Sequence, residues 1–402
     1  KLFNPISYDP NKWADLFQKA GAKYVVLTSK HHDGFCLWPS DHSRGYNSFD
    51  GKANRDLLGD LNQAVKKKGI RSGFYYSLYE WEHPDYPENV PLYVDNYMLP
   101  QLKDAVQRYE PDIIFSDGEW DRHSTEWKSE EFLAWLYNDS NAPKDIVVND
   151  RWGGETRFRH GGYFSTEYDP NSGAMNEEFL KRGWEECRGI GKSFGYNQNE
   201  TIEDYNTSEE LIRLLVDIVS RGGNLLLNIG PKSDGTIPDI MSDRLFEIGK
   251  WLEINGGAIY GSTPNRIFQS DGIKFTLSKY RKTLFAFVEK FQEKTLKIRG
   301  VNATGEKHIQ CLGSDQALEW ENKGSDLIMQ VTNSFIDDLK FSPIYVLQIP
   351  VLPYLDKPKV QVSIENKIAE ISINSDNSTS TYLFEIGDTT NNNLTREYKN
   401  PF

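Results

Sequence analysis

Short apolar segments alternate with amphipathic segments along the first 260 residues of the chain. The apolar segments are rich in aromatic and aliphatic residues and predict strands at 24–29, 73–78, 112–116, 146–149, 163–166 and 224–228, with a further strand around 194–197. The amphipathic segments predict helices at 55–68, 97–109, 130–137, 209–221 and 242–255. Strands and helices that alternate at this spacing indicate a parallel sheet with crossover helices.

Six or seven such strands favour a (β/α)8-like (TIM-type) barrel over an open doubly wound sheet. No Gly-x-Gly-x-x-Gly turn follows the first strand, which argues against a dinucleotide site. The chain opens on a helix predicted to start at Asp9 and end at Gly21. Because a barrel closes with eight strands, we expect that the N-terminal part of the barrel, with one or two strands, is absent from this chain.

The pattern changes after Gly256 and Gly257. Alternating segments without helices recur at 274–277, 285–289, 296–298, 327–331 and 345–349, which predicts an antiparallel β-sandwich. Three prolines between residues 350 and 358 indicate a linker, and the tail alternates again from Lys359. We therefore expect a barrel over 1–262, a sandwich over 263–352, and a linker with a partial small β module over 353–402.

Composition narrows the classes of protein. The formal net charge of the 402-residue chain is −13, which argues against sequence-independent binding to nucleic acid or to an anionic membrane surface. The mean hydropathy of −0.62 and the absence of a long apolar run argue against membrane insertion. Three widely separated cysteines exclude a disulfide framework and a Cys-x-x-Cys zinc site. The aromatic content of 13% is typical of many carbohydrate-active proteins.

Acidic residues follow three of the predicted strands, where a parallel barrel places its reactive groups. The segment Phe115–Trp120 (FSDGEW) carries an apolar strand directly into Asp117, and the alternative is an ordinary Asp-Gly turn. Asp150 and Glu167 follow the next two strands. Two carboxylates across one barrel mouth suit glycoside hydrolysis, in which one attacks or activates water and the other donates a proton. Arg151 suits either a sugar hydroxyl or a carboxylate, and a structural salt bridge is the alternative.

Two adjacent histidines, His31 and His32, follow the first strand in the segment KHHDGF. If strand geometry continues through them, the two histidines point to opposite faces, and no third ligand has a recognisable spacing, so hydrogen bonding to a polyol is favoured over a metal site. A structural histidine with satisfied hydrogen bonds is the alternative for either one. Tyr76 and Trp81 add a hydroxyl and a stacking face near the end of the second strand, although each residue type is also common in cores. We expect neither a metal nor a cofactor.

Six motifs occur in order along the chain: KHHDGF (30–35), FSDGEW (115–120), VNDRWG (148–153), STEY (165–168), FGYN (194–197) and GGNLLLNIGP (222–231). Together they resemble the α-L-fucosidases of glycoside hydrolase family 29. The resemblance runs from about Asp9 to Tyr260 and weakens through the predicted sandwich. It implies a retaining enzyme on a (β/α)8-like barrel followed by a β-sandwich. It also implies that the substrate is a fucosylated oligosaccharide or glycoconjugate that loses terminal α-L-fucose.

The resemblance assigns roles to eight residues. Asp117 matches the nucleophile and Glu167 the general acid/base. Residues that match the lining of the fucose subsite, or border the sugar, are His31, His32, Tyr76, Trp120, Arg151 and Phe194. Phe194 is the candidate for an apolar wall against the C6 methyl group of fucose.

The family carries about ninety further residues upstream, including a histidine and a glutamate that bind fucose, and these positions do not exist here. The tail near residue 402 resembles the start of a chitobiase-type C-terminal module. A non-catalytic sugar-binding protein on a degenerate barrel is therefore the main alternative, and a metal-dependent hydrolase that uses His31 and His32 is a third. The resemblance also implies a secreted, periplasmic or lysosomal location.

Overall fold

The computed structural model describes residues 3–168, 182–291, 294–305, 308–339 and 341–352. Beyond residue 352 it describes the backbone of four strands, which pair as two antiparallel hairpins: β16 (Lys359–Glu365) with β17 (Ile368–Asn374), and β18 (Tyr382–Ile386) with β19 (Leu394–Tyr398). The alternating apolar residues of the tail thus form strands.

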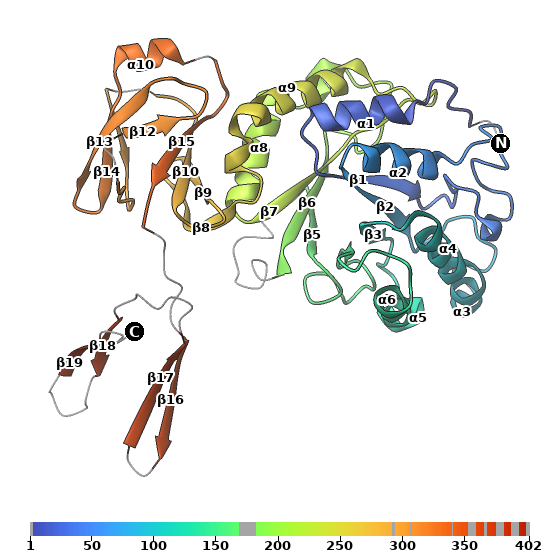
Figure 1. The fold of residues 1–402 in the computed structure, drawn as a ribbon. Coiled ribbons are helices and arrows are strands. Elements are labelled where there is room, and N and C mark those ends of the chain that lie inside the picture. The colour runs from blue at the N-terminus through green and yellow to red at the C-terminus, as the bar shows by residue number, and fades with distance from the viewer. Residues whose placement is uncertain are drawn as a thin grey trace.

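Seven parallel strands form the first half of the fold (Figure 1). They are β1 (Tyr24–Lys30), β2 (Arg71–Ser77), β3 (Ile113–Asp117), β4 (Val147–Val148), β5 (Phe164–Glu167), β6 (Trp184–Gly189) and β7 (Gly223–Asn228). The first four and the last three are paired in sequence order, and a parallel bridge between Asn149 and Tyr163 connects the two groups. The result is one curved parallel arc, as a (β/α)8-like barrel requires.

Helices cover the outer side of this arc (Figure 1). They are α1 (Pro10–Lys19), α2 (Leu57–Lys67), α3 (Val90–Tyr93), the π-helical turn η2 (Val94–Met98), α4 (Leu99–Tyr109), α5 (Ser124–Trp127), α6 (Ser129–Asn138), α8 (Ser208–Ser220) and α9 (Asp239–Asn255), with short 3₁₀ turns η1 (Asp41–Ser43), η3 (Ile202–Asp204) and η4 (Gly256–Ala258). Asp9 caps α1 by accepting hydrogen bonds from the backbone N–H groups of Asn11 and Lys12, which confirms the predicted start. Thr207 and Glu210 form a capping box at the start of α8.

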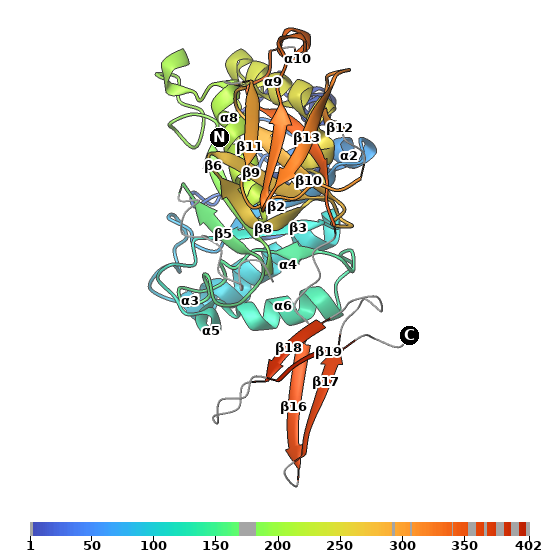
Figure 2. The same cartoon turned by 90° about the vertical axis from the view of Figure 1, so that its left-hand side faces the viewer.

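The second half of the fold is an eight-stranded antiparallel sheet ordered β11-β14-β13-β12-β15-β10-β9-β8. Its strands are β8 (Thr263–Ser270), β9 (Ile273–Leu277), β10 (Thr283–Val288), β11 (Thr295–Ile298), β12 (His308–Cys311), β13 (Ala317–Lys323), β14 (Asp326–Gln330) and β15 (Tyr345–Pro350), and the short helix α10 (Asn333–Asp338) joins the last two. Residues 317–319 pair with β12 and residues 320–323 pair with β14, so β13 passes from one layer to the other. Figure 2, viewed from this side, shows the antiparallel strands in front of the barrel.

A shared apolar core fixes the antiparallel sheet against the barrel. Phe285 and Phe287 of β10 and Val346 of β15 pack in one cluster with Ile248 and Trp251 of α9. The Trp251 indole N–H also donates to the carbonyl oxygen of Ile344 at 2.9 Å. Residues of α8 and α9 belong to the same apolar cluster as residues of β10 and β15, so the barrel and the antiparallel sheet share one hydrophobic core.

The structure corrects one expectation about the strands. Residues 194–197 form no strand. The sixth parallel strand is β6, which precedes them at residues 184–189. Its sequence, WEECRG, carries two glutamates that a pattern of apolar residues does not mark as a strand. Both glutamates are buried: the hydroxyls of Tyr24 and Tyr163 donate to Glu185, while the Thr166 hydroxyl donates to Oε2 of Glu186 and Nε of Arg188 lies 3.1 Å from its Oε1.

The strands at the two ends of the arc, β1 and β7, pair with no other strand on their outer edges among the described residues. A search of the same residues found no helix with the length and apolar character needed to cross a membrane. Cys36, Cys187 and Cys311 are unpaired and buried.

Candidate active site

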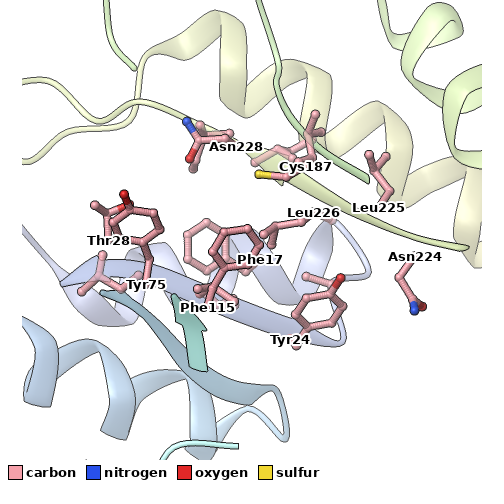
Figure 3. Close-up of a pocket in the computed structure, with 18 of the residues that line it drawn as sticks. Phe17, Tyr24, Thr28, Tyr75, Phe115, Cys187, Asn224, Leu225, Leu226 and Asn228 are labelled. Carbon is pink, nitrogen blue, oxygen red and sulfur yellow. The ribbon is translucent and has the colours of Figure 1, made fainter. Parts of the chain in front are cut away.

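A cavity of about 1500 Å³ begins at the carboxyl ends of the parallel strands and continues between β1 and β7 (Figure 3). In Figure 3, Tyr24, Thr28 and Tyr75 lie on one side of it and Cys187, Leu226 and Asn228 on the other. Seven of the eight residues predicted from the sequence line this cavity: His31, His32, Asp117, Trp120, Arg151, Glu167 and Phe194.

Asp117 is the last residue of β3, and its carboxylate is bound on both oxygens. Oδ1 accepts a hydrogen bond from Nη1 of Arg151 at 2.8 Å, and Oδ2 accepts one from the Tyr75 hydroxyl at 2.7 Å. Burial would raise the pKa of Asp117, yet the Arg151 charge and these hydrogen bonds hold it below its usual value. The side chain is therefore an ionised carboxylate in a largely desolvated position, as a nucleophile requires.

Glu167, the last residue of β5, faces the same guanidinium. Its Oε2 lies 3.1 Å from Nη2 of Arg151, and its side chain is 39% exposed, against 11% for Asp117. One arginine thus connects the two carboxylates through its two terminal nitrogens. The more exposed of the two has access to solvent, which suits a residue that exchanges protons with a leaving group and with water.

Arg151 is itself held in place by buried neighbours. Its Nε donates to the Ser165 hydroxyl at 2.9 Å, and Ser165 donates in turn to Oδ1 of Asp150 at 2.7 Å. The guanidinium carbon lies 4.9 Å from the centre of the Phe115 ring. Asp150, fully buried, therefore supports Arg151 from behind and does not supply a carboxylate to the cavity.

His31 and His32 both reach the cavity, with ring centres 4.0 Å apart. The expectation that they point to opposite faces depended on strand geometry continuing through them, and this condition is not met because β1 ends at Lys30. Burial lowers the pKa of His31, and burial with the charges of His31 and Lys30 lowers that of His32 to about 4. The described residues contain no group of three or more histidine, cysteine or acidic side chains placed to hold a metal.

The structure places Tyr76 outside the cavity. Its side chain is fully buried on the helix side of β2, where the hydroxyl donates to Oε1 of Gln101 at 2.8 Å and contacts the ammonium group of Lys30. Tyr75, its neighbour, faces the cavity and binds Asp117. Two adjacent tyrosines on a strand face opposite sides, and the sequence interpretation chose the wrong one.

Aromatic side chains border the mouth of the cavity. Trp120 is 55% exposed and its ring centre lies 5.2 Å from that of His32. Trp81 is 59% exposed and approaches the same histidine at 5.7 Å. Phe194 is 41% exposed and lies edge-on to Tyr168, the residue after Glu167. Exposed aromatic faces around a polar pocket suit the apolar faces of sugar rings.

Three contributors were missed from the sequence: Tyr75, Phe115 and Ser77. In the register of β2 and β3, Tyr75 pairs with Phe115 and Ser77 pairs with Asp117, so all four positions have the same parity on neighbouring strands. Counting alternate residues backward from Asp117 along β3 identifies Phe115. Extending the count to Tyr75 and Ser77 needs the register of β2 against β3, which the sequence does not provide.

Comparisons with known proteins agree with this geometry. The family described as Alpha-L-fucosidase matches residues 1–257. The chain is 43% identical over 325 residues to the tissue alpha-L-fucosidase of Rattus norvegicus, a match that covers 78% of this chain and 69% of that protein. It is also 43% identical over 292 residues to an alpha-L-fucosidase of Dictyostelium discoideum, covering 70% of this chain and 62% of that protein. The chain therefore spans about two thirds of the length of these relatives.

Solved structures show the same likeness. A Thermotoga maritima alpha-fucosidase in complex with fucose superposes with a TM-score of 0.72 at 35% identity, covering 87% of this chain and 80% of that one. An alpha-L-fucosidase from Bacteroides thetaiotaomicron gives a TM-score of 0.77 at 26% identity, covering 88% and 83%. The barrel and the antiparallel sheet are thus shared with solved fucosidases.

Proposed function

Because the chain belongs to the α-L-fucosidase family of glycoside hydrolases, we propose that it removes terminal α-L-fucose from fucosylated glycans with retention of configuration. The observation that carries this proposal is the Arg151 guanidinium, which binds Asp117 with one terminal nitrogen and Glu167 with the other. The proposal expects the two carboxyl groups to lie about 5–5.5 Å apart, the separation that retaining enzymes use.

In the first step a carboxylate oxygen of Asp117 attacks the anomeric carbon. The bond from that carbon to the glycosidic oxygen breaks, and its electron pair stays on the departing oxygen, which takes a proton from the Glu167 carboxyl group. The products are a covalent fucosyl ester on Asp117 and the free alcohol. Arg151 positions both groups and balances the charge of Asp117 until the ester forms.

In the second step water attacks the same carbon while Glu167 takes its proton. The ester bond to Asp117 breaks, the carboxylate is restored, and fucose leaves with its original configuration. The 39% exposure of Glu167 supports this exchange with water. Two displacements at one carbon account for retention.

The remaining cavity residues bind the sugar in this proposal. His31 and His32 supply hydrogen-bonding groups beside Asp117, while Trp120 and Phe194 supply apolar faces at the mouth. A deoxy sugar has an apolar methyl group in place of one hydroxyl, and an exposed aromatic ring is a suitable wall for it. Phe194 is the proposed wall.

The test is to hydrolyse an aryl α-L-fucoside and to identify by NMR, in the first minutes, which anomer of fucose is released. Retention requires that α-L-fucose appears first, and initial release of the β anomer would overturn the mechanism. Asp117→Gly should remove nearly all turnover, and added azide should restore it by forming the β-fucosyl azide. Glu167→Ala should slow substrates with poor leaving groups far more than aryl fucosides with good ones.

The alternatives give different results in the same assays. A non-catalytic sugar-binding protein would bind fucose without hydrolysing either class of fucoside. A metal-dependent hydrolase would lose its activity after dialysis against a chelator. We also propose the boundaries 1–262, 263–352 and 353–402 for the three parts of the chain, which limited proteolysis with mass spectrometry would test.

A further inference from the structure

The imidazole ring of His32 lies between a serine and the proposed nucleophile. Its Nδ1 is 2.7 Å from the hydroxyl oxygen of Ser77, and its Nε2 is 3.8 Å from Oδ2 of Asp117. Ser77 is fully buried, lies behind the ring, and does not line the cavity. The ring therefore has one nitrogen facing the protein interior and one facing the sugar site.

The protons of this arrangement can be counted. The Ser77 hydroxyl has a single proton, and it donates that proton to the carbonyl oxygen of Tyr79 at 2.6 Å, which can only accept. The Ser77 oxygen must then accept a hydrogen bond from His32, so the histidine proton is on Nδ1. In a neutral ring the other nitrogen, Nε2, is left with a lone pair.

From this chain of hydrogen bonds we propose that Ser77 is a positioning residue. It fixes His32 as the Nδ1–H tautomer, so that Nε2 accepts a hydrogen bond from a hydroxyl group of the bound sugar. The inference rests on the proposed function for the identity of the sugar, but the tautomer itself is a property of the free protein.

The surroundings of the ring support this assignment. Nε2 and Oδ2 of Asp117 are both acceptors, and a distance of 3.8 Å between them leaves room for a donor that serves both. Burial and the charges of His31 and Lys30 outweigh the Asp117 carboxylate and keep the pKa of His32 near 4, so the ring is neutral near pH 7. The rings of Tyr79, Trp81 and Trp120 pack around it at 5.2 to 5.7 Å and restrict its rotation.

Gly118 preserves the space that this arrangement needs. It follows Asp117 with a φ of +75°, and a Cβ at this position would lie 2.7 Å from Cβ of Tyr79 and 3.0 Å from the Ser77 hydroxyl. Any larger residue at position 118 would displace either Ser77 or the turn at Tyr79, whose carbonyl oxygen accepts the hydrogen bond from Ser77. The glycine after the proposed nucleophile thus leaves room for the contact between Ser77 and His32.

The consequence concerns specificity. An acceptor beside the nucleophile recognises a hydroxyl that donates, and it discriminates against a sugar in which that hydroxyl is replaced by hydrogen. With the opposite tautomer, Nε2–H would instead point at the Asp117 carboxylate and compete for it. Ser77 therefore affects which sugar is bound, although it does not touch the sugar.

The primary test is ¹⁵N NMR of the full chain labelled at histidine, which has seven such residues. His32 should show a protonated Nδ1 and an unprotonated Nε2 at pH 7, with His32→Asn used only for assignment. A protonated Nε2, or a doubly protonated ring, would overturn the proposal directly. Because this measurement needs neither substrate nor turnover, it is decided separately from the proposed function.

The second test compares variants of Ser77. Ser77→Ala should allow the Nε2–H tautomer to appear and should lower kcat/KM for an aryl fucoside roughly tenfold, the loss of about one hydrogen bond. Ser77→Thr, which keeps the hydroxyl, should restore the tautomer and most of the activity. Ser29→Ala is the matched control, because Ser29 is also buried and donates to a strand carbonyl, that of Tyr75, at 2.7 Å without contacting a histidine.

The third test measures inhibition by fucose and its monodeoxy analogues. In the wild-type protein one deoxy position should weaken inhibition about tenfold, and in Ser77→Ala that penalty should largely disappear. An unchanged tautomer in Ser77→Ala, or the same penalty in both proteins, would contradict the role of Ser77. A loss of activity with an unchanged tautomer would mean that the serine is merely structural.

Discussion

Arg151 donates from Nη1 to Oδ1 of Asp117 at 2.8 Å, and both side chains are almost completely buried. The guanidinium spans two carboxylates because its terminal nitrogens are fixed in one plane, whereas lysine has a single point of charge. Arg151→Lys should therefore keep the charge near Asp117 but lose the contact with Glu167. We expect kcat/KM for an aryl fucoside to fall by a factor of about 100 or more, measured by release of the aryl group.

Arg157→Lys is the control for this experiment. Arg157 is a neighbouring, half-buried arginine whose guanidinium reaches the carbonyl oxygen of Ser165 at 3.3 Å and does not contact Asp117. It should lose less than about tenfold. Equal losses in the two variants would show that general packing, and not the bridge between carboxylates, explains the effect of Arg151.

Tyr75 predicts a change in the pH profile. Its hydroxyl donates to Oδ2 of Asp117 and so stabilises the ionised carboxylate, which lowers the pKa of Asp117. Since attack needs the ionised form, kcat/KM falls as the pH drops through that pKa. Tyr75→Phe removes the hydrogen bond and raises the pKa, so the acidic limb should move to higher pH.

Tyr76→Phe separates this effect from a general loss of stability. It removes a buried hydroxyl from the adjacent residue, whose partner is Gln101 on α4. The free energy of unfolding should fall by about 1 kcal/mol, while the acidic limb should stay in place. A shift of the acidic limb in Tyr76→Phe, with none in Tyr75→Phe, would show that Tyr76, and not Tyr75, acts on Asp117.

These two tyrosines also show how far the sequence can be interpreted. The alternation of apolar and amphipathic segments predicted six of the seven parallel strands, because buried strands need apolar side chains on both faces. The same burial on both faces hides which side of β2 faces the cavity, since Tyr75 and Tyr76 are both suitable for an interior. Only the register of β2 against β3 decides it.

Polar residues buried in the barrel account for the other differences. The sequence does not predict β6 because Glu185 and Glu186 do not have the pattern of a buried strand, although hydroxyl groups and Arg188 bind their carboxylates in the folded protein. The other seven predicted site residues line the cavity, since acids at strand ends and the six motifs depend on chain order alone. Contacts between residues far apart in the sequence, such as that of Ser77 with His32, leave no mark in the sequence.

The buried ion pair of Glu80 and Lys30, which directly precedes the two histidines in the sequence, should contribute strongly to the free energy of unfolding. Nζ and Oε2 are 3.0 Å apart, and the side chains are 0% and 3% exposed. Lys30→Met would leave Glu80 buried without its partner and should cost about 3–5 kcal/mol in the free energy of unfolding. Urea denaturation of Lys30→Met, Glu80→Gln and the double variant should show that the two losses are not additive.

A surface pair provides the comparison. Lys250 and Glu247 on α9 are 69% and 50% exposed, so Lys250→Met should change the free energy of unfolding by no more than about 1 kcal/mol. A similarly small change for Lys30→Met would contradict the structural role of the buried pair.

Glu119 predicts how stability depends on pH. It is 2% exposed, and burial together with the nearby Asp117 carboxylate raises its pKa to about 7. The folded protein therefore binds a proton on Glu119 more tightly than the unfolded chain does, and this contribution to stability is lost as pH rises through about 7.

Glu119→Gln cannot ionise, so it should gain stability relative to the wild type between pH 5 and 8, by up to about 3 kcal/mol. Thermal or urea unfolding across this range tests the sign. A wild type that gains on Glu119→Gln as pH rises would show that the Glu119 carboxylate is stabilised, not penalised, where it lies.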